Sequence, residues 1–358
     1  MPKNPIMITR TPPATHTPRW QHSLATAIRD PATLARRLSL APEHLPGMQA
    51  GHASFPIRVP ESWLARIVPG EPKDPLLRQV LPLAEETDEV PGFVADPVGD
   101  HDALAAPGVV HKYAGRALLL TTGACAIHCR YCFRREFDYA DHNPARDDWG
   151  PALDYLAAHP DIHEVILSGG DPLSQSDTRL ARLVARLEAI PHLERLRIHT
   201  RLPVVLPERV DDALLGWLGQ GRLQHVVVLH ANHPREFAAP ADRALERLRA
   251  IGITLLNQAV LLAGVNDDAD TLVELQESGF RHDVLPYYLH CLDRTRGTAH
   301  FEVPPDRAAA IYREMHRRLP GYLLPRRVRE IAGEPGKTPI AGIPADGETS
   351  FPDFYPDF

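Results

Sequence analysis

Three of the four cysteines in this 358-residue chain lie close together, at Cys125, Cys129 and Cys132. Cysteines at this spacing can hold one inorganic centre, although closed zinc sites and electron-carrying iron–sulfur clusters take four protein ligands. Three ligands would leave one iron of a [4Fe-4S] cluster open to bind a small molecule and act on it. The alternatives are a zinc site completed by a distant cysteine or by His128, and an unpaired remnant of a disulfide framework. The fourth cysteine, Cys291, lies far downstream and is interpreted as a buried thiol.

The cysteines follow an apolar run at 117–120, and beyond them short β-branched runs alternate with amphipathic helical segments. Such alternation predicts an α/β fold with a parallel sheet and right-handed crossovers. The expected strands are 117–121, 164–167, 196–199, 225–230, 254–262 and 284–289, and the expected helices are 177–189, 211–219, 234–250, 268–279 and 304–318. Six such units are too few for the eight of a complete barrel.

The remaining segments predict a division of the chain into four parts. Residues 1–18 are rich in Pro and Thr and are expected to form a disordered tail. Residues 19–113 are expected to form an N-terminal helical extension followed by a loop from residue 81; Asp30 and Pro31 mark the start of one helix. The core is predicted at 114–320, and a C-terminal segment at 321–358.

Composition points to small molecules or proteins as partners. The net charge is −7, the isoelectric point is near 6.2, and the basic residues are dispersed, so nucleic-acid binding is not indicated. No stretch approaches the roughly 20 apolar residues of a membrane helix, and the N-terminus has no apolar signal region. We therefore expect a cytoplasmic protein that does not insert into membranes.

A second motif, Gly169-Gly170-Asp171, follows the predicted strand at 164–167. Paired glycines let the backbone approach a ligand closely, and Asp171 can offer a carboxylate to an ammonium group. Taken alone, the motif is typical of an ordinary strand-to-helix turn.

Together, the cysteine triplet after a strand and the Gly-Gly-Asp motif resemble the radical S-adenosylmethionine (SAM) superfamily. The resemblance implies a partial (β/α)6 TIM-like barrel that carries a [4Fe-4S] cluster and SAM. It also implies that Gly169, Gly170 and Asp171 contact the SAM amino group, and that Tyr131 and Phe133 border the adenine.

A lone lysine, Lys337, lies in a Gly/Pro-rich turn in the C-terminal segment. A loop lysine is by default solvated surface, but its amine can also form a Schiff base with a carbonyl cofactor. With the rest of the chain from about 100 to 343, this turn resembles the pyridoxal phosphate (PLP) lysine of the lysine 2,3-aminomutase family. By that resemblance Lys112, Arg116 and Gln258 hold the PLP phosphate.

The same resemblance implies the substrate contacts. Arg134 would bind an α-carboxylate, while Asp293 and Glu330 would bind an ε-ammonium group, which together describe lysine. The structural alternatives are that Arg134 pairs with Glu136 and that Asp293 joins a surface network with Arg294 or Arg296.

Some residues differ from the longer, clostridial-type enzymes: Glu330 replaces an Asp and Lys112 replaces an Arg. The short form resembles the type that makes (R)-β-lysine for attachment to elongation factor P by a partner ligase, with flavodoxin or ferredoxin as the reductant. Two alternatives stay open. The nearer is a radical SAM aminomutase acting on glutamate or arginine, and the more distant is a zinc-stabilised barrel with a binding role.

Overall fold

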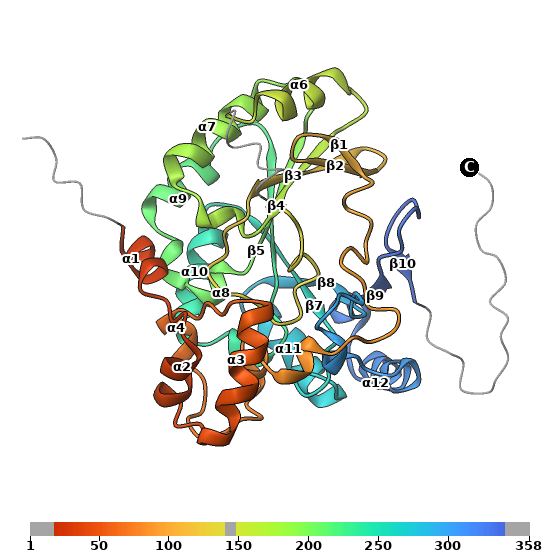
Figure 1. Ribbon diagram of the computed structural model, residues 1–358. Coiled ribbons are helices and arrows are strands. Elements are labelled where there is room, and N and C mark those ends of the chain that lie inside the picture. The colour runs from red at the N-terminus through yellow and green to blue at the C-terminus, as the bar shows by residue number, and fades with distance from the viewer. Residues whose placement is uncertain (1–17, 140–147, 341–358) are drawn as a thin grey trace, which may run out of the picture.

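The computed structural model describes residues 18–139 and 148–340 (Figure 1). The predicted tail at 1–18 lies outside this part of the chain except for Pro18, as does the end of the predicted C-terminal segment after residue 340. No helix within the described residues is both long and apolar enough to cross a membrane.

The centre of the molecule is a ten-stranded sheet whose strands follow one another in chain order. Its inner strands, β3 to β9, are all parallel, and the pairs at both ends are antiparallel. The strands are β1 (Leu104–Ala106), β2 (Val109–Tyr113), β3 (Arg116–Thr122), β4 (Glu164–Gly169), β5 (Arg195–Thr200), β6 (Gln224–Leu229), β7 (Thr254–Val260), β8 (Val284–His290), β9 (Arg326–Arg329) and β10 (Thr338–Pro339). The predicted α/β class and the six parallel strands β3–β8 are confirmed.

The structure differs from the prediction at both ends of the sheet. Residues 104–113, expected to be part of a loop, form the β1–β2 hairpin, with Gly108 at a φ of 73° in the turn. At the other end β9 adds a seventh parallel strand, beside β8. Its sequence of three arginines and one valine lacks the apolar run expected of an interior strand, because β9 needs to bury only Arg327 and Val328.

The helices that connect the strands pack on the outside of the curved sheet (Figure 1). In α7 the residues Leu180, Leu183 and Leu187 recur at helical spacing and are completely buried, which explains why the segment is a helix and which face packs inward. The helices of this part are α6 (Gly150–Ala158), α7 (Asp177–Glu188), α8 (Leu202–Val205), α9 (Asp212–Leu218), α10 (Ala239–Ala250), α11 (Ala269–Phe280) and α12 (Pro305–Arg318).

The N-terminal extension consists of short helices that share one hydrophobic core with the barrel. The side chain of Asp30 caps α2 by accepting a hydrogen bond from the Thr33 backbone N–H at 2.8 Å. Trp20, Met48 and Trp63 carry its apolar surface into the core. The helices are α1 (Arg19–Ala25), α2 (Pro31–Arg37), α3 (Leu45–Ser54), α4 (Glu61–Leu64) and α5 (Pro75–Arg78).

Candidate active site

One cavity of about 390 Å³ is bounded by the carboxyl ends of the parallel strands, the cysteine loop and the C-terminal turn. All of the site residues expected from the sequence line it: Lys112, Arg116, Cys125, Cys129, Tyr131, Cys132, Phe133, Arg134, Gly169, Gly170, Asp171, Gln258, Asp293, Glu330 and Lys337. Residues more than 200 positions apart are therefore brought to the same end of the barrel, where α/β folds place their chemistry.

The three cysteines lie in the irregular loop after β3, and all of them are free thiols. Burial and the neighbouring Cys129 raise the pKa of Cys132 to about 11, so iron binding would have to displace protons from crowded sulfurs. Within the described residues, no three His, Cys, Asp or Glu side chains converge on a point that one metal ion could occupy. A four-iron cluster makes no such demand, because its cysteine ligands bind different irons, and the trio fits that group.

Arg130 anchors the cysteine loop to the N-terminal extension. Its completely buried guanidinium donates to both carboxylate oxygens of Glu86, at 2.9 and 2.5 Å, and to the backbone carbonyls of Gly51 and Phe55. Arg135 adds a second ion pair to Glu86 at 2.8 Å. His128, the alternative zinc ligand, has its Nδ1 2.8 Å from the Pro56 carbonyl oxygen, so it too contacts the extension.

The two glycines at the end of β4, Gly169 and Gly170, are required by the approach of the cysteine loop. Gly169 has a φ of +112°, and a Cβ there would lie 2.6 Å from the Thr122 carbonyl oxygen. A Cβ on Gly170 would lie 2.4 Å from the Ala124 carbonyl oxygen. Any side chain at these positions would therefore push the Gly-Gly turn away from the cysteines.

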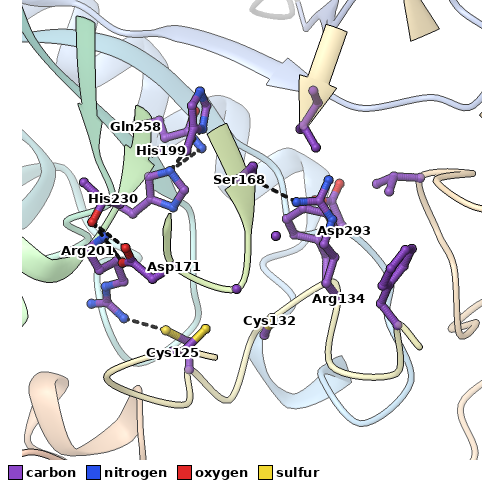
Figure 2. Close-up of a pocket in the computed structure, with 18 of the residues that line it drawn as sticks. Cys125, Cys132, Arg134, Ser168, Asp171, His199, Arg201, His230, Gln258 and Asp293 are labelled. Carbon is purple, nitrogen blue, oxygen red and sulfur yellow. Dashed lines mark hydrogen bonds between the residues drawn. The ribbon is translucent and has the colours of Figure 1, made fainter. Parts of the chain in front are cut away.

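Asp171 differs from its expected role as a carboxylate that is free to bind an ammonium group. Thr200 Oγ1 donates to its two carboxylate oxygens at 2.7 and 2.9 Å, and the backbone N–H groups of Arg201 and Leu173 donate at 2.8 and 3.1 Å. Burial nevertheless raises its pKa to about 6. Figure 2 shows the carboxylate turned toward Arg201, so within this structure Asp171 ties the Gly-Gly turn to the end of β5.

The two aromatic residues of the cysteine loop face different neighbours. Tyr131 packs edge-on against Phe301, and its hydroxyl oxygen accepts a hydrogen bond from the Asn232 amide at 2.6 Å. Phe133 lies under the Arg134 guanidinium, whose carbon is 4.7 Å from the ring centre. Both rings border the cavity next to the cysteines.

Arg134 is held by a carboxylate that the sequence analysis did not identify. Its Nε donates to Asp100 Oδ2 at 2.6 Å and its Nη1 donates to Ser168 Oγ at 3.0 Å (Figure 2). The other oxygen of Asp100 pairs with Lys112 Nζ at 2.6 Å. These two cations hold the pKa of Asp100 near 2 against the effect of its burial. Asp100 therefore fixes one cation expected to bind the substrate and one expected to bind phosphate.

The pairs named as structural alternatives for Arg134 and Asp293 are not formed, although Arg134 does pair with another acid, Asp100. Glu136 pairs with Arg296 at 2.9 Å instead of with Arg134, and Arg294 pairs with Glu302 at 2.7 Å. Asp293 faces the cavity, and within the described residues its carboxylate has no hydrogen-bond partner. Burial raises the pKa of Asp293 to about 7, although the Lys337 ammonium opposes this shift.

Glu330 contacts three polar side chains of the cavity: Tyr113, Lys112 and Lys337. One of its oxygens accepts a hydrogen bond from the Tyr113 hydroxyl at 2.7 Å and lies 3.4 Å from Lys112 Nζ, while the other pairs closely with Lys337 Nζ. Lys337 and the other cations lower the pKa of Glu330, so it is ionised. Ion pairs thus run without a break from Arg134 through Asp100, Lys112 and Glu330 to Lys337.

A group of imidazoles, also missed from the sequence, completes the wall. Gln258 Nε2 lies 3.0 Å from His230 Nε2, and His230 lies 3.3 Å from His199 Nδ1 (Figure 2). Burial lowers the pKa of His230 to about 3, so the imidazole is neutral at physiological pH. Gln258 Oε1, His199 Nε2 and His290 Nε2 are buried without a partner in the described residues. Polar atoms of this kind need a partner, and a bound cofactor would provide one.

Arg116, the last of the expected phosphate ligands, stacks on Tyr113, with its guanidinium carbon 4.7 Å from the ring centre. Tyr113 in turn donates to Glu330, so β2, β3 and the C-terminal segment meet at this point.

Comparison with known proteins adds to this geometry. A model of the Radical SAM superfamily matches residues 119–275. The chain is 47% identical to the L-lysine 2,3-aminomutase of Escherichia coli over 90% of this chain and 94% of that protein. It is also 47% identical to that of Haemophilus influenzae, over 89% and 94%. The chain belongs to the radical SAM lysine 2,3-aminomutase family. The Clostridium subterminale L-lysine 2,3-aminomutase is 34% identical, over 90% of this chain and 77% of that protein.

Lysine 2,3-aminomutases use a [4Fe-4S] cluster, SAM and PLP. The cluster and SAM generate a carbon-centred radical that abstracts hydrogen, and PLP carries the migrating amino group. The cysteine trio fits the cluster, the Gly-Gly turn lies directly against the cysteine loop, and Lys337 lies among the cations Lys112 and Arg116 that suit a phosphate. The donor sets of this chain therefore fit all three groups.

Proposed function

We propose that this enzyme converts (S)-α-lysine to (R)-β-lysine, with Arg134 binding the α-carboxylate and with Asp293 and Glu330 binding the ε-ammonium group. One observation carries the proposal: a single cavity contains Arg134, the carboxylates of Asp293 and Glu330, and Lys337 beside the cysteine trio. A substrate with a carboxylate at one end and a cation at the other complements this set of charges.

Glu330 already holds a cation of the kind proposed. The Lys337 ammonium occupies its carboxylate, and a substrate ammonium has the same charge and the same donors. If Lys337 were bound to PLP, Glu330 would lose this ammonium partner and could bind that of the substrate; Asp293, whose carboxylate has no hydrogen-bond partner in the described residues, lies in the same cavity.

The remaining side chains are proposed to hold the cofactors. Lys112, Arg116 and Gln258 bind the PLP phosphate, and Lys112 is kept in place by Asp100. Gly169 and Gly170 contact the SAM amino group through their backbone, with Asp171 supporting the turn, and Tyr131 and Phe133 border the adenine. Neutral His230 orients Gln258 through the contact between their side chains.

The charges of the cavity also separate lysine from glutamate, one of the two alternative substrates. Asp293 and Glu330 would repel the side-chain carboxylate of glutamate, while the longer guanidinium of arginine would retain their attraction. Anaerobic assays of the reconstituted enzyme with lysine, arginine and glutamate test this. We expect a β-amino acid from lysine, and Glu330→Ala should raise the KM for lysine. Equal or faster turnover of arginine or glutamate would contradict the assignment.

We further propose that the β-lysine is made in the cytoplasm for attachment to elongation factor P by a partner ligase, with a flavodoxin or ferredoxin supplying the electron. The support is the sequence resemblance to the short type of enzyme, together with the near-complete coverage of the Escherichia coli relative. Deleting the gene should remove the β-lysyl mass from purified elongation factor P, and added (R)-β-lysine should restore it. An unchanged mass would reject this link.

A further inference from the structure

Arg201 is a buried cation that contacts the cysteine trio and has no role in the function proposed above. It directly follows β5, is 6% exposed, and donates from Nη1 to Cys129 Sγ at 2.8 Å. Its backbone N–H donates to Asp171 Oδ2 at 2.8 Å (Figure 2). By contrast, no charged side chain in the described residues donates a hydrogen bond to the sulfur of Cys125 or Cys132.

The position of this guanidinium is fixed on its other side. Nη2 donates to Glu236 Oε2 and to Gln79 Oε1, both at 2.8 Å, and the guanidinium carbon lies 4.9 Å from the centre of the Trp63 ring. Glu236 is completely buried and is held by Gln79 Nε2 and by the Asn232 backbone N–H. Arg201 therefore cannot turn away from the sulfur without breaking a buried ion pair.

A fixed donor on a ligating sulfur changes the free energy of adding an electron to an iron–sulfur cluster. Reduction adds negative charge, which spreads onto the cysteine sulfurs, and a cation that donates to one of them stabilises the reduced state more than the oxidised one. The negative charge of Glu236 lessens this effect, but its carboxylate contacts Nη2, whereas Nη1 faces the sulfur. Because the positive charge is closer to the sulfur than the negative charge, the net effect favours the reduced cluster.

We propose that Arg201 is a positioning residue that raises the reduction potential of the cluster through Cys129. The step it assists is the gain of one electron by the oxidised cluster from a low-potential one-electron donor. No proton moves, and the guanidinium stays charged throughout. The inference rests on the cluster of the family and is independent of which amino acid is the substrate.

The test is a redox titration of the anaerobically reconstituted protein, followed by the electron paramagnetic resonance signal of the reduced cluster, without lysine or PLP. At the wild-type midpoint, Arg201→Gln should lower the ratio of reduced to oxidised cluster by about tenfold, which for one electron equals a shift of about 59 mV to more negative potential. Iron and sulfide contents, measured on the same samples, establish that the cluster is present.

Arg209→Gln is the matched control. Arg209 is also a fully buried guanidinium, but it pairs with Asp177 and contacts no cysteine sulfur. The midpoint potential of the cluster in Arg209→Gln should equal that of the wild type. A fully loaded Arg201→Gln protein with the same potential as this control would overturn the proposal.

Glu236→Gln tests the proposal in the opposite direction and decides it if Arg201→Gln fails to hold iron. This substitution removes the negative charge behind the guanidinium and leaves one acceptor oxygen, where the carboxylate accepts from Arg201 Nη2 on Oε2 and from Gln79 Nε2 and the Asn232 backbone N–H on Oε1. The midpoint potential should then become more positive than that of the wild type. An unchanged or more negative potential in a loaded Glu236→Gln protein would contradict a role for Arg201 in setting the potential.

Discussion

The cysteine loop and the Lys337 turn face the same cavity but are held in different ways. Around the cysteines, Arg130, Arg135 and Arg201 are paired with fully buried carboxylates that bind no ligand in our proposal. Around Lys337, the acid that pairs with it, Glu330, is itself expected to bind substrate, and the carboxylate of Asp293 has no hydrogen-bond partner in the described residues.

This difference follows from what each region must do. A cluster site has to keep its geometry in every state, and buried, fully hydrogen-bonded ion pairs resist movement. A substrate site has to exchange one cation for another, so its carboxylates stay near the cavity surface. The N-terminal extension and the C-terminal segment thus support different functions of one barrel.

Lys337→Ala should cause the largest effect and separate the two regions. Turnover and the visible absorbance of enzyme-bound PLP should both be lost, because the other lysine of the cavity lining among the described residues, Lys112, is held by ion pairs to Asp100 and Glu330. Iron content should not change, because Lys337 makes no contact with the cysteine loop. Lys73→Ala, in the N-terminal extension, serves as the control and should keep both the turnover and the visible absorbance of bound PLP. Retained turnover in Lys337→Ala would refute the assignment of this lysine.

Arg130→Gln should affect the cysteine region instead. It leaves the buried Glu86 carboxylate with only one of its two cations, and breaking a buried pair costs about 3–5 kcal/mol. Chemical denaturation should show that loss of stability. The control, Arg249→Gln, breaks a pair with Asp283 whose side chains are more than half exposed, and should cost less than about 1 kcal/mol. Equal losses in both variants would contradict the contrast drawn here.

Asp100→Asn should weaken lysine binding without removing iron. Asp100 holds Arg134 and Lys112, and charge-assisted hydrogen bonds of this kind contribute about 1.5–3 kcal/mol. We expect the KM for lysine to rise by about tenfold or more, since 1.4 kcal/mol corresponds to a factor of ten. Asp100→Glu should restore part of the affinity. A change in kcat alone, with KM unaltered, would argue against a role in positioning.

The pH dependence should be the smallest effect. Asp293 has a pKa of about 7 because burial disfavours its charge, so below pH 7 it is mostly protonated and cannot bind an ammonium group well. Between pH 8 and pH 6 its ionised fraction falls about tenfold, and kcat/KM for lysine should fall with it. Asp293→Asn should be less active and should lack this titration. The same profile in both proteins would assign the titration to another group.

The parts of the site that depend on local pattern could be predicted from the sequence. The cysteine spacing, the glycine pair and the six apolar strands are each contained in a short stretch. Because parallel strands end at one edge of a sheet, the same pattern also places their loops together.

The pairings between distant segments could not be predicted in this way. Asp100 lies in a loop with no periodic pattern, and only the fold shows that it bridges Arg134 and Lys112. The carboxylate of Asp171 looked free in the sequence, but the end of β5 supplies its donors. The strand β9 was not predicted because three of its four residues are arginines, so it lacks the apolar run that marks the other parallel strands.

The central claim is that both regions serve one reaction, and product analysis tests it most directly. The reconstituted protein, with verified iron content, is incubated anaerobically with SAM, PLP, dithionite and (S)-α-lysine, and the β-lysine formed is separated on a chiral column. We predict (R)-β-lysine from the wild type and none from Lys337→Ala. A fully loaded wild-type protein that forms no β-lysine would contradict the account.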